Sequence, residues 1–212
     1  MGRPLTPLLS VDLIAETALE IIDSGEPFSM RRLAKRLGVS APALYNHVEG
    51  KDALVELIRG VMVAQHPVPR DAGGTWVDRV TVIARAQRAA YSAHPNVVPL
   101  LIGVPLAQPE VLEIYRDLAR ALASAGFDDA EVGVLLEVID SFAIGNALEQ
   151  RAPQQIWVDP DDEGALARAM GSWSSPQALL DEAFETGLEF ILGGMQARLS
   201  KRPPVDEAPT SP

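Results

Sequence analysis

The sequence predicts an all-α protein of about nine to ten helices, with a small N-terminal headpiece and a larger C-terminal body. Three observations favour this reading. Apolar residues recur at the three- and four-residue spacing of helices along most of the 212 residues. No segment alternates apolar and polar residues as a strand does. A Pro- and Gly-rich stretch at 66–74 divides residues 1–66 from residues 75–200, and the proline-rich residues 201–212 are expected to form a disordered tail.

Four helices are expected in residues 1–66, and each has a local start or stop signal. Ser10 and Ser40 can cap helix N-termini, because a side-chain oxygen there accepts a hydrogen bond from a first-turn amide. Gly38 fits the left-handed residue that ends a helix, and the Gly-Glu-Pro sequence at 25–27 stops the first helix. The expected helices cover residues 10–24, 29–37, 41–48 and 51–65.

Six further helices are expected in residues 75–200. Gly126 followed by Phe127 predicts a helix end at which Phe127 packs back against Leu122. Asp128 with Glu131 three residues later has the spacing of a capping box that begins the next helix. The expected helices cover residues 75–94, 96–103, 109–125, 128–151, 163–173 and 175–199.

The composition excludes several classes of site. With 0 Cys and 3 His, the chain offers no thiolate ligand and little room for a histidine site, so neither a metal nor a cofactor is expected. No apolar run reaches the roughly 18 residues of a membrane span, and no secretory leader is visible, so the expected location is the cytoplasm. The common phosphate, dinucleotide and nucleophile motifs are missing, which argues against an enzyme.

The charge is distributed unevenly along the chain. The net charge is −11, but residues 28–51 contain five basic residues and one acidic residue. An acidic body therefore carries one small basic patch. The patch is either a solvated helix face or a surface that meets phosphates, and phosphate contacts depend on local charge.

Residues 29–47 have the spacing of a helix-turn-helix. Ala34 is small enough for two helices to cross closely, and Gly38 makes the turn. The second, short helix would enter the major groove of DNA with its N-terminal residues, while the ends of both helices meet phosphates. The expected DNA-contacting residues are Ser29, Met30, Arg31, Ser40, Ala41, Pro42, Ala43, Tyr45, Asn46, His47 and Lys51.

The stretch Met30–Val48, with Lys51 after it, resembles the signature of the tetracycline-repressor (TetR) family of bacterial regulators. The resemblance implies a ligand-responsive transcriptional repressor, which binds a palindromic operator as a homodimer and is released by a small effector. The alternative is a helical module that binds small molecules or proteins and does not bind an operator.

The body is similar to that of the tetracycline-repressor subclass, at Trp76 and at residues 93–95, 125–127 and 142–149. This similarity implies a dimer formed by the eighth and last helices, and an effector pocket among the fifth to eighth helices. The last helix is apolar around more than one face, which also favours burial on two sides; a central helix of a monomer is the alternative. The expected dimer residues are Leu136, Phe142, Leu180, Phe184, Leu188, Ile191 and Met195.

The tetracycline-binding members hold magnesium through a His and a Thr, at positions occupied here by Leu101 and Val104. Neither side chain can ligate a hard cation, so a largely hydrophobic effector is expected instead of magnesium–tetracycline. For each polar candidate, core packing or solvent exposure is the alternative. The candidate effector residues are Gln87, Tyr91, Leu101, Val104, Tyr115, Asp117, Asp140, Asn146 and Glu149, with stacking surface from Trp157 and Trp173.

Overall fold

The computed structural model describes residues 9–69, 74–150 and 164–201, and these residues form ten helices and no strand. The predicted all-α fold class is confirmed. Residues 1–8, which the prediction assigned to an N-terminal arm, lie outside the described residues, as do Trp157 and residues 202–212 of the expected tail. The helices are α1 (Val11–Asp23), α2 (Met30–Leu37), α3 (Ala41–Tyr45), α4 (Lys51–Gln65), α5 (Trp76–Ala93), α6 (Val98–Leu101), α7 (Pro109–Ser124), α8 (Asp129–Glu149), α9 (Ala165–Gly171) and α10 (Pro176–Ser200).

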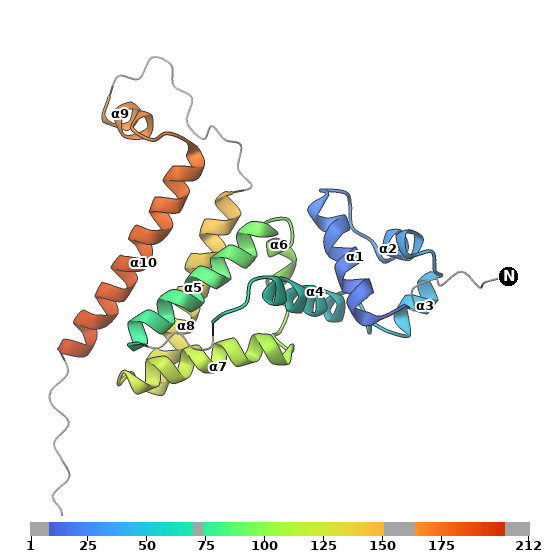
Figure 1. The fold of residues 1–212 in the computed structure, drawn as a ribbon, viewed down its shortest axis with the longest axis horizontal. Helices are drawn as coiled ribbons and strands as arrows, with labels where there is room; N and C mark the ends of the chain where they lie inside the picture. Colours follow the sequence, from blue (N-terminus) through green and yellow to red (C-terminus); the bar gives the residue numbers. More distant parts are fainter. Residues whose placement is uncertain (1–8, 70–73, 151–163, 202–212) are drawn as a thin grey trace, which may run out of the picture.

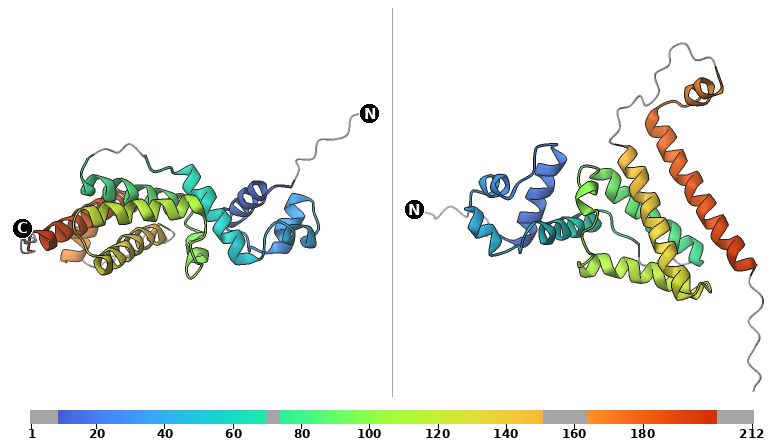
Figure 2. Two further views of the ribbon diagram at one scale, coloured as in Figure 1. Left: turned by 90° about the horizontal axis from the view of Figure 1, so that it is seen from below. Right: turned by 180° about the vertical axis from the view of Figure 1, so that it is seen from behind.

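The molecule is elongated, with a three-helix head at one end and a helical body at the other (Figure 1). Helices α1–α3 form the head, and α4 runs from the head into the body, where it meets α5, α6 and α7. Helix α10 lies along the outer side of α8, as Figure 2 shows from behind. No helix in the described part of the chain is long and apolar enough to cross a membrane.

Two cores hold these helices together. One lies inside the head and continues into the end of α5 and into α6, through Ala90, Val97 and Leu101. The other lies inside the body between α5, α7, α8 and α10 and is centred on Phe184, which is fully buried. Head and body therefore meet through a shared apolar core as well as through the continuous backbone of α4.

The predicted helix caps are present. The hydroxyl groups of Ser10 and Ser40 accept from the amides of Leu13 and Ala43 at 3.1 and 3.3 Å. Gly38 has φ 70°, a left-handed conformation that glycine adopts without steric cost. Phe127 is buried and its amide donates to the Leu122 carbonyl at 3.3 Å, as the expected helix end requires.

Two helices are shorter than predicted. Helix α3 ends at Tyr45, because the amide of His47 donates to the Leu44 carbonyl in a tighter turn; Val48 remains buried beyond the helix end. Helix α6 has only four residues and is followed by Gly103 in the left-handed region, at φ 80°. The last turn of each expected helix is replaced by a turn that redirects the chain.

Candidate functional site

The head presents α3 to solvent on a rigid support. Leu33 of α2 and Leu44 of α3 are fully buried in the same core of the head. Ala34 of α2 is 3% exposed and belongs to this core as well. The left-handed Gly38 sets the direction of the chain between them. The orientation of α3 is therefore fixed by packing and not by its own five residues, which are too few to form a stable helix alone.

The exposed surface of α3 and of the turn after it contains most of the predicted DNA contacts. Tyr45 is 54% exposed and points away from the core, as Pro42, Asn46 and His47 also do. Ala41 and Ala43 are half-buried at the base of this surface. The hydroxyls of Ser29 and Ser40 cap α2 and α3, so each keeps a proton that can be donated to a phosphate oxygen.

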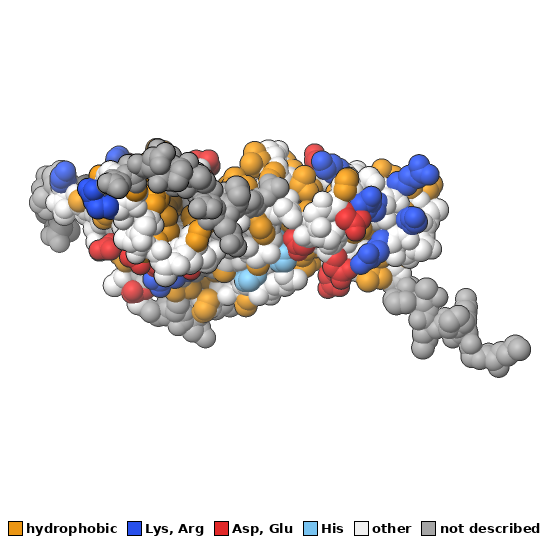
Figure 3. All heavy atoms as spheres, turned by 90° about the horizontal axis from the view of Figure 1, so that it is seen from above, with side chains coloured by type: hydrophobic (Ala, Val, Ile, Leu, Met, Phe, Trp, Pro, Cys, Tyr) orange, Lys and Arg blue, Asp and Glu red, His pale blue; other side chains and the backbone are white. Residues whose placement is uncertain are grey.

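Basic side chains gather at the head end of the molecule (Figure 3). Arg32 and Arg36 are engaged by Glu26 and Glu20 at 2.5 and 3.8 Å. Arg31 and Lys51 are exposed, and no described acidic residue pairs with either one. The two unpaired cations flank α3 at the ends of α2 and α4, where they can meet an anionic backbone. Met30 is half-buried and packs on the head core.

A buried ion pair on α4 joins the head to the body, and the sequence analysis did not identify it. Glu56 is 5% exposed and Arg59 is 7% exposed, and their facing atoms lie 3.1 Å apart. Glu56 Oε2 accepts from the amides of Ala107 and Gln108, at 2.6 and 3.3 Å. Arg59 donates to the carbonyls of Leu101 and Val104, both at 3.2 Å. The pair therefore fastens α4 to both ends of the α6–α7 connection.

Arg59 also stands between two hollows in the body. The first, of about 30 Å³, lies between α4, α5 and α7, and the second, of about 250 Å³, lies beneath the α6–α7 connection against α8. Arg59, Tyr91 and Tyr115 line both hollows and form the wall between them. We refer to the two hollows together as the cavity.

The polar side chains of the cavity converge on one carboxylate. The hydroxyls of Tyr91 and Tyr115 donate to Asp140 Oδ1, at 3.1 and 2.9 Å. The amide nitrogen of Gln87 lies 3.4 Å from the same oxygen. Three of the helices, α5, α7 and α8, thus contribute to one cluster, and four predicted effector residues come together there.

Burial dominates the protonation of this cluster. Burial raises the pKa of Asp140 above its ordinary value, against the lowering effect of the hydrogen bonds from Tyr115 and Tyr91. Burial and the neighbouring carboxylate also raise the pKa of Tyr91. The tyrosines therefore stay protonated, and their protons are committed to Asp140. Leu101 and Val104 line the larger hollow and give this end an apolar wall.

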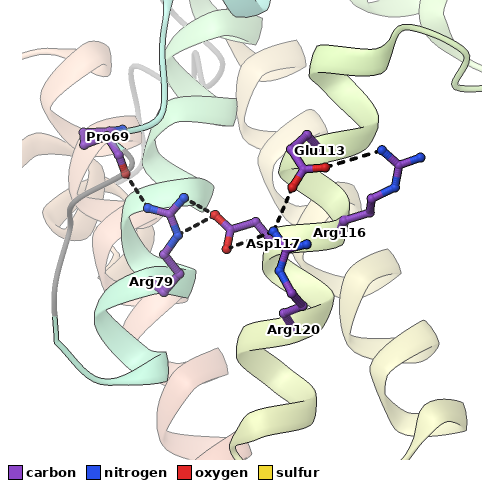
Figure 4. Close-up of polar contacts among 6 residues, drawn as sticks. All are labelled: Pro69, Arg79, Glu113, Arg116, Asp117 and Arg120. Atoms are coloured by element: carbon purple, nitrogen blue, oxygen red, sulfur yellow. Dashed lines mark hydrogen bonds and ion pairs between the residues drawn. The ribbon is translucent and has the colours of Figure 1, made fainter.

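Three predicted effector residues lie elsewhere. Asp117 forms an ion pair with Arg79, whose Nε donates to it at 2.8 Å, and this cluster lies on the outer side of α5 and α7 (Figure 4). Asn146 accepts from Arg88 at 2.7 Å and donates to the Leu180 carbonyl at 3.1 Å, so it joins α5, α8 and α10. Glu149 is exposed near the end of α8. None of the three lines the described cavity, because partners on neighbouring helices orient the first two away from it. Trp173 is 38% exposed, at the start of the α9–α10 connection.

The expected dimer residues divide into two groups. Phe184, Leu188 and Met195 are buried in the chain's own body core, so they are not available to a partner. The reason is that one apolar face of α10 packs on α8 and α5 within the same chain. Leu136, Phe142, Leu180 and Ile191 are half-buried at the edge of this packing.

Part of the apolar surface that remains exposed lies on α8 and α10. Val134 and Val138 of α8 are 62% and 40% exposed, and Phe190 of α10 is 73% exposed. Gly187 brings α10 close to α8, because a Cβ there would lie 2.5 Å from Phe142 Cζ. These three exposed residues are not among the expected dimer residues.

A histidine links the head to the end of α5. His94 Nδ1 lies 2.7 Å from Asp23 Oδ2 at the end of α1, and His94 Nε2 lies 2.8 Å from Gln65 Oε1 at the end of α4. Asn96 donates to the Asp23 carbonyl at 3.3 Å. Both ring nitrogens thus face oxygen atoms, and three helix ends are tied together at one point.

A helix-turn-helix head with exposed basic residues at Arg31 and Lys51, fastened to a helical body with an internal cavity, is typical of a DNA-binding regulator. Comparison with known families agrees: residues 24–58 match the model described as bacterial regulatory proteins, tetR family. Residues 68–199 match the model described as tetracyclin repressor-like, C-terminal domain. The chain belongs to the TetR family of transcriptional regulators.

Relatives align over nearly the whole chain. The tetracycline repressor protein class C of Escherichia coli is 31% identical over 204 residues, which cover 89% of this chain and 91% of the relative. An HTH-type transcriptional regulator of Saccharopolyspora erythraea is 28% identical over 207 residues. The aligned region covers 90% of this chain and 86% of the relative. These relatives are transcriptional regulators and not enzymes.

Solved structures share the fold. Apo ActR from Streptomyces coelicolor superposes with a TM-score of 0.75 at 26% identity, over 95% of this chain and 99% of that one. ActR in complex with actinorhodin superposes with a TM-score of 0.73 at 26% identity, over 92% and 99%. These findings confirm the prediction of a ligand-responsive DNA-binding regulator and disfavour a helical module without operator binding.

Proposed function

We propose that this chain represses transcription by holding a palindromic operator with two copies of its head, and that a small, largely apolar effector releases it. One observation carries the proposal: the exposed face of α3 is held rigidly beside unpaired Arg31 and Lys51, while α4 fastens the same head to a cavity. In this proposal residues 1–66 form the arm, head and linking helix, residues 75–200 bind effector and dimerise, and residues 201–212 form a tail.

Sequence would be read mainly by Asn46. Its exposed amide can bond adenine in a bidentate way in the major groove, whereas Ala41 and Ala43 would pack against thymine methyl groups. Tyr45 and Lys51 would hold phosphates, which position the head without distinguishing sequences. Ser29, Ser40 and Arg31 would add phosphate contacts at the two helix ends.

The proposed dimer forms through α8 and α10. Burying Val134, Val138 and Phe190 against a second copy removes the large apolar side chains that α8 and α10 expose in the described structure. A two-fold dimer also meets the geometric need of the operator, since two heads must reach half-sites roughly 34 Å apart. In this proposal the two helices of each copy form a four-helix bundle, as the resemblance to the tetracycline-repressor subclass implies.

The effector would act through the Glu56–Arg59 pair. Arg59 lines the cavity and at the same time holds the carbonyls of Leu101 and Val104, so a ligand that moves this wall moves α4. Release requires different effector affinities in the two states, and a 100-fold difference corresponds to about 2.7 kcal/mol. ActR is similar in fold and has been solved with actinorhodin, which supports an organic effector for this chain.

No catalytic step is proposed for this chain, and its working place would be the cytoplasm, where bacterial DNA is accessible. The apolar Leu101 and Val104 disfavour magnesium–tetracycline as the effector.

The experiment that tests the function is selection of bound sequences from a random duplex pool at about 150 mM salt, a concentration at which non-specific phosphate binding is weak. We expect a palindrome with half-sites about one helical turn apart. The enriched duplex then serves as the probe for salt dependence and for release by candidate effectors. Failure to enrich any sequence, with the protein shown to be folded, would contradict the proposal.

A further inference from the structure

In the cluster around Asp140, each donor group has an acceptor, whereas some of the acceptor atoms have no donor among the described residues. Tyr91, Tyr115 and Gln87 all direct their donors to one oxygen, Asp140 Oδ1. No described residue donates to Asp140 Oδ2, and Gln87 Oε1 is buried without a partner. Because an ionised carboxylate only accepts, the Gln87 amide is held with its nitrogen toward Asp140 and its oxygen free. Of these two acceptors, Asp140 belongs to the lining of the larger hollow, so a ligand there meets an open acceptor at Oδ2.

The charges of the cavity lining point the same way. Arg59 is the one Arg or Lys side chain that lines the described hollows, and its charge is compensated by Glu56 at 3.1 Å. Asp140 has no ion pair with any described residue. His66 lines the smaller hollow, and burial and His94 lower its pKa, so it adds no positive charge. Asp140 is thus a half-buried carboxylate without an ion pair: the charge of Arg59 acts on it from a distance and is already shared with Glu56, so a cationic ligand would be favoured.

The remaining lining is apolar. Met62 and Ile114 are typical of the smaller hollow, and Ile102, Leu106 and Ile144 of the larger one. A ligand that fills the larger hollow, of about 250 Å³, must bury a hydrocarbon skeleton and place its polar group at the Asp140 cluster. An anionic group there would meet a like charge in surroundings that screen it poorly.

We propose that the effector is an apolar amine, whose protonated amino group donates to Asp140 Oδ2 from the larger hollow. This inference rests on the proposed function, in that the effector is taken to bind in the cavity. An ammonium group supplies hydrogen-bond donors for Asp140 Oδ2, and it also supplies a positive charge beside the carboxylate. A carboxylic acid of the same skeleton supplies neither.

Three probes with one skeleton test the chemistry: 2-naphthylmethylamine, 2-naphthylmethanol and the 2-naphthoate anion. Binding is measured at pH 7 by calorimetry on the full chain. We expect the amine to bind more tightly than the alcohol by about tenfold or more, because hydrogen bonds to charged groups are the stronger kind. We expect the naphthoate to bind more weakly than the alcohol.

Two matched variants locate the effect. Asp140→Asn keeps the shape of the side chain and removes its charge, and it should abolish the preference for the amine over the alcohol. Asp117→Asn makes the same change at a carboxylate outside the cavity and should keep the preference. The thermal transitions of both variants establish that they are folded.

Binding to the selected operator is measured separately, so that failure of the amine proposal is distinguished from failure of the regulator function. The amine proposal is overturned if naphthoate binds as tightly as the amine, if Asp140→Asn keeps the preference, or if none of the probes binds up to several millimolar. A chain that binds its operator and gives one of these results remains a regulator with an effector of different chemistry.

Discussion

Replacing Arg59 with Met breaks the buried ion pair that fastens α4 to the body. The substitution keeps most of the side-chain volume, so its cost arises mainly from the charge that is left behind. Removing one partner of a buried pair costs about 3–5 kcal/mol, because the other charge remains desolvated and unpaired. Glu56 keeps its two backbone donors, the amides of Ala107 and Gln108, which favours the lower end, about 3 kcal/mol.

This cost should be visible in thermal unfolding. For a chain of 212 residues, 1 kcal/mol corresponds to about 2–4 °C in Tm, so Arg59→Met should lower Tm by about 6–12 °C at fixed protein concentration. The double variant Glu56→Gln/Arg59→Met should be less destabilised than Arg59→Met alone, because the glutamine oxygen still accepts from the two amides and no isolated charge stays buried. The facing atoms of the pair are close but not aligned as a hydrogen bond, so the attraction is mainly ionic.

Arg85→Met is the matched control. Arg85 also pairs with a glutamate, Glu185, at 2.6 Å, but both side chains are about half exposed. An exposed pair contributes at most about 1 kcal/mol, so this variant should unfold within a few degrees of the wild type. Our reasoning is refuted if Arg59→Met is no more destabilising than Arg85→Met, or if the double variant is the least stable of all.

Three further predictions concern DNA, assembly and pH. Asn46→Ala should relax discrimination at one operator position by about 1–3 kcal/mol, whereas Lys51→Ala should weaken all sequences alike and reduce the salt slope by about one; identical profiles on a mutated operator set would contradict this division. Phe190→Glu should give a monomer in sedimentation and weaken operator binding, while Glu189→Gln should remain dimeric; a dimeric Phe190→Glu would place the interface elsewhere. The pKa of Asp140 is raised, so the folded state binds more protons at this site, and stability is lost as pH rises from the unfolded pKa toward the folded one. Asp140→Asn should therefore gain stability relative to wild type as pH rises through that window in denaturant titrations, and a constant difference would count against the raised pKa.

The features that sequence predicted well depend on neighbours within a few residues. The serine caps, the left-handed Gly38 and the capping box at Asp128 each need only a short stretch of backbone, so they could be located without the tertiary fold. The helix-turn-helix belongs to the same class, since Leu33 and Leu44 meet across a short turn. The buried and the exposed residues of the helix-turn-helix could both be assigned from their spacing in the sequence.

The features that sequence missed depend on helices that meet from far apart in the chain. Glu56 and Arg59 have the i,i+3 spacing of an ordinary exposed pair, and only the arrival of the α6–α7 connection buries them. Asp117 was expected in the cavity, yet Arg79 of α5 holds it on the outer side. Phe184 was expected to meet a partner, because an apolar helix does not reveal which of its faces its own chain covers.

The effector response must pass through a junction that the Pro- and Gly-rich stretch at 66–74 does not mark. Leu101 of α6 lies in the same core as the head helices, and its carbonyl is held by Arg59 of α4. His94 fixes the end of α1 to the end of α5 at the same junction. A displacement of α6 therefore cannot be absorbed by a loose linker: it must break these polar contacts or turn the head with it. Since close-packed cores resist gradual deformation, the head is expected to turn as a unit, which is the motion that changes the spacing of two heads on an operator.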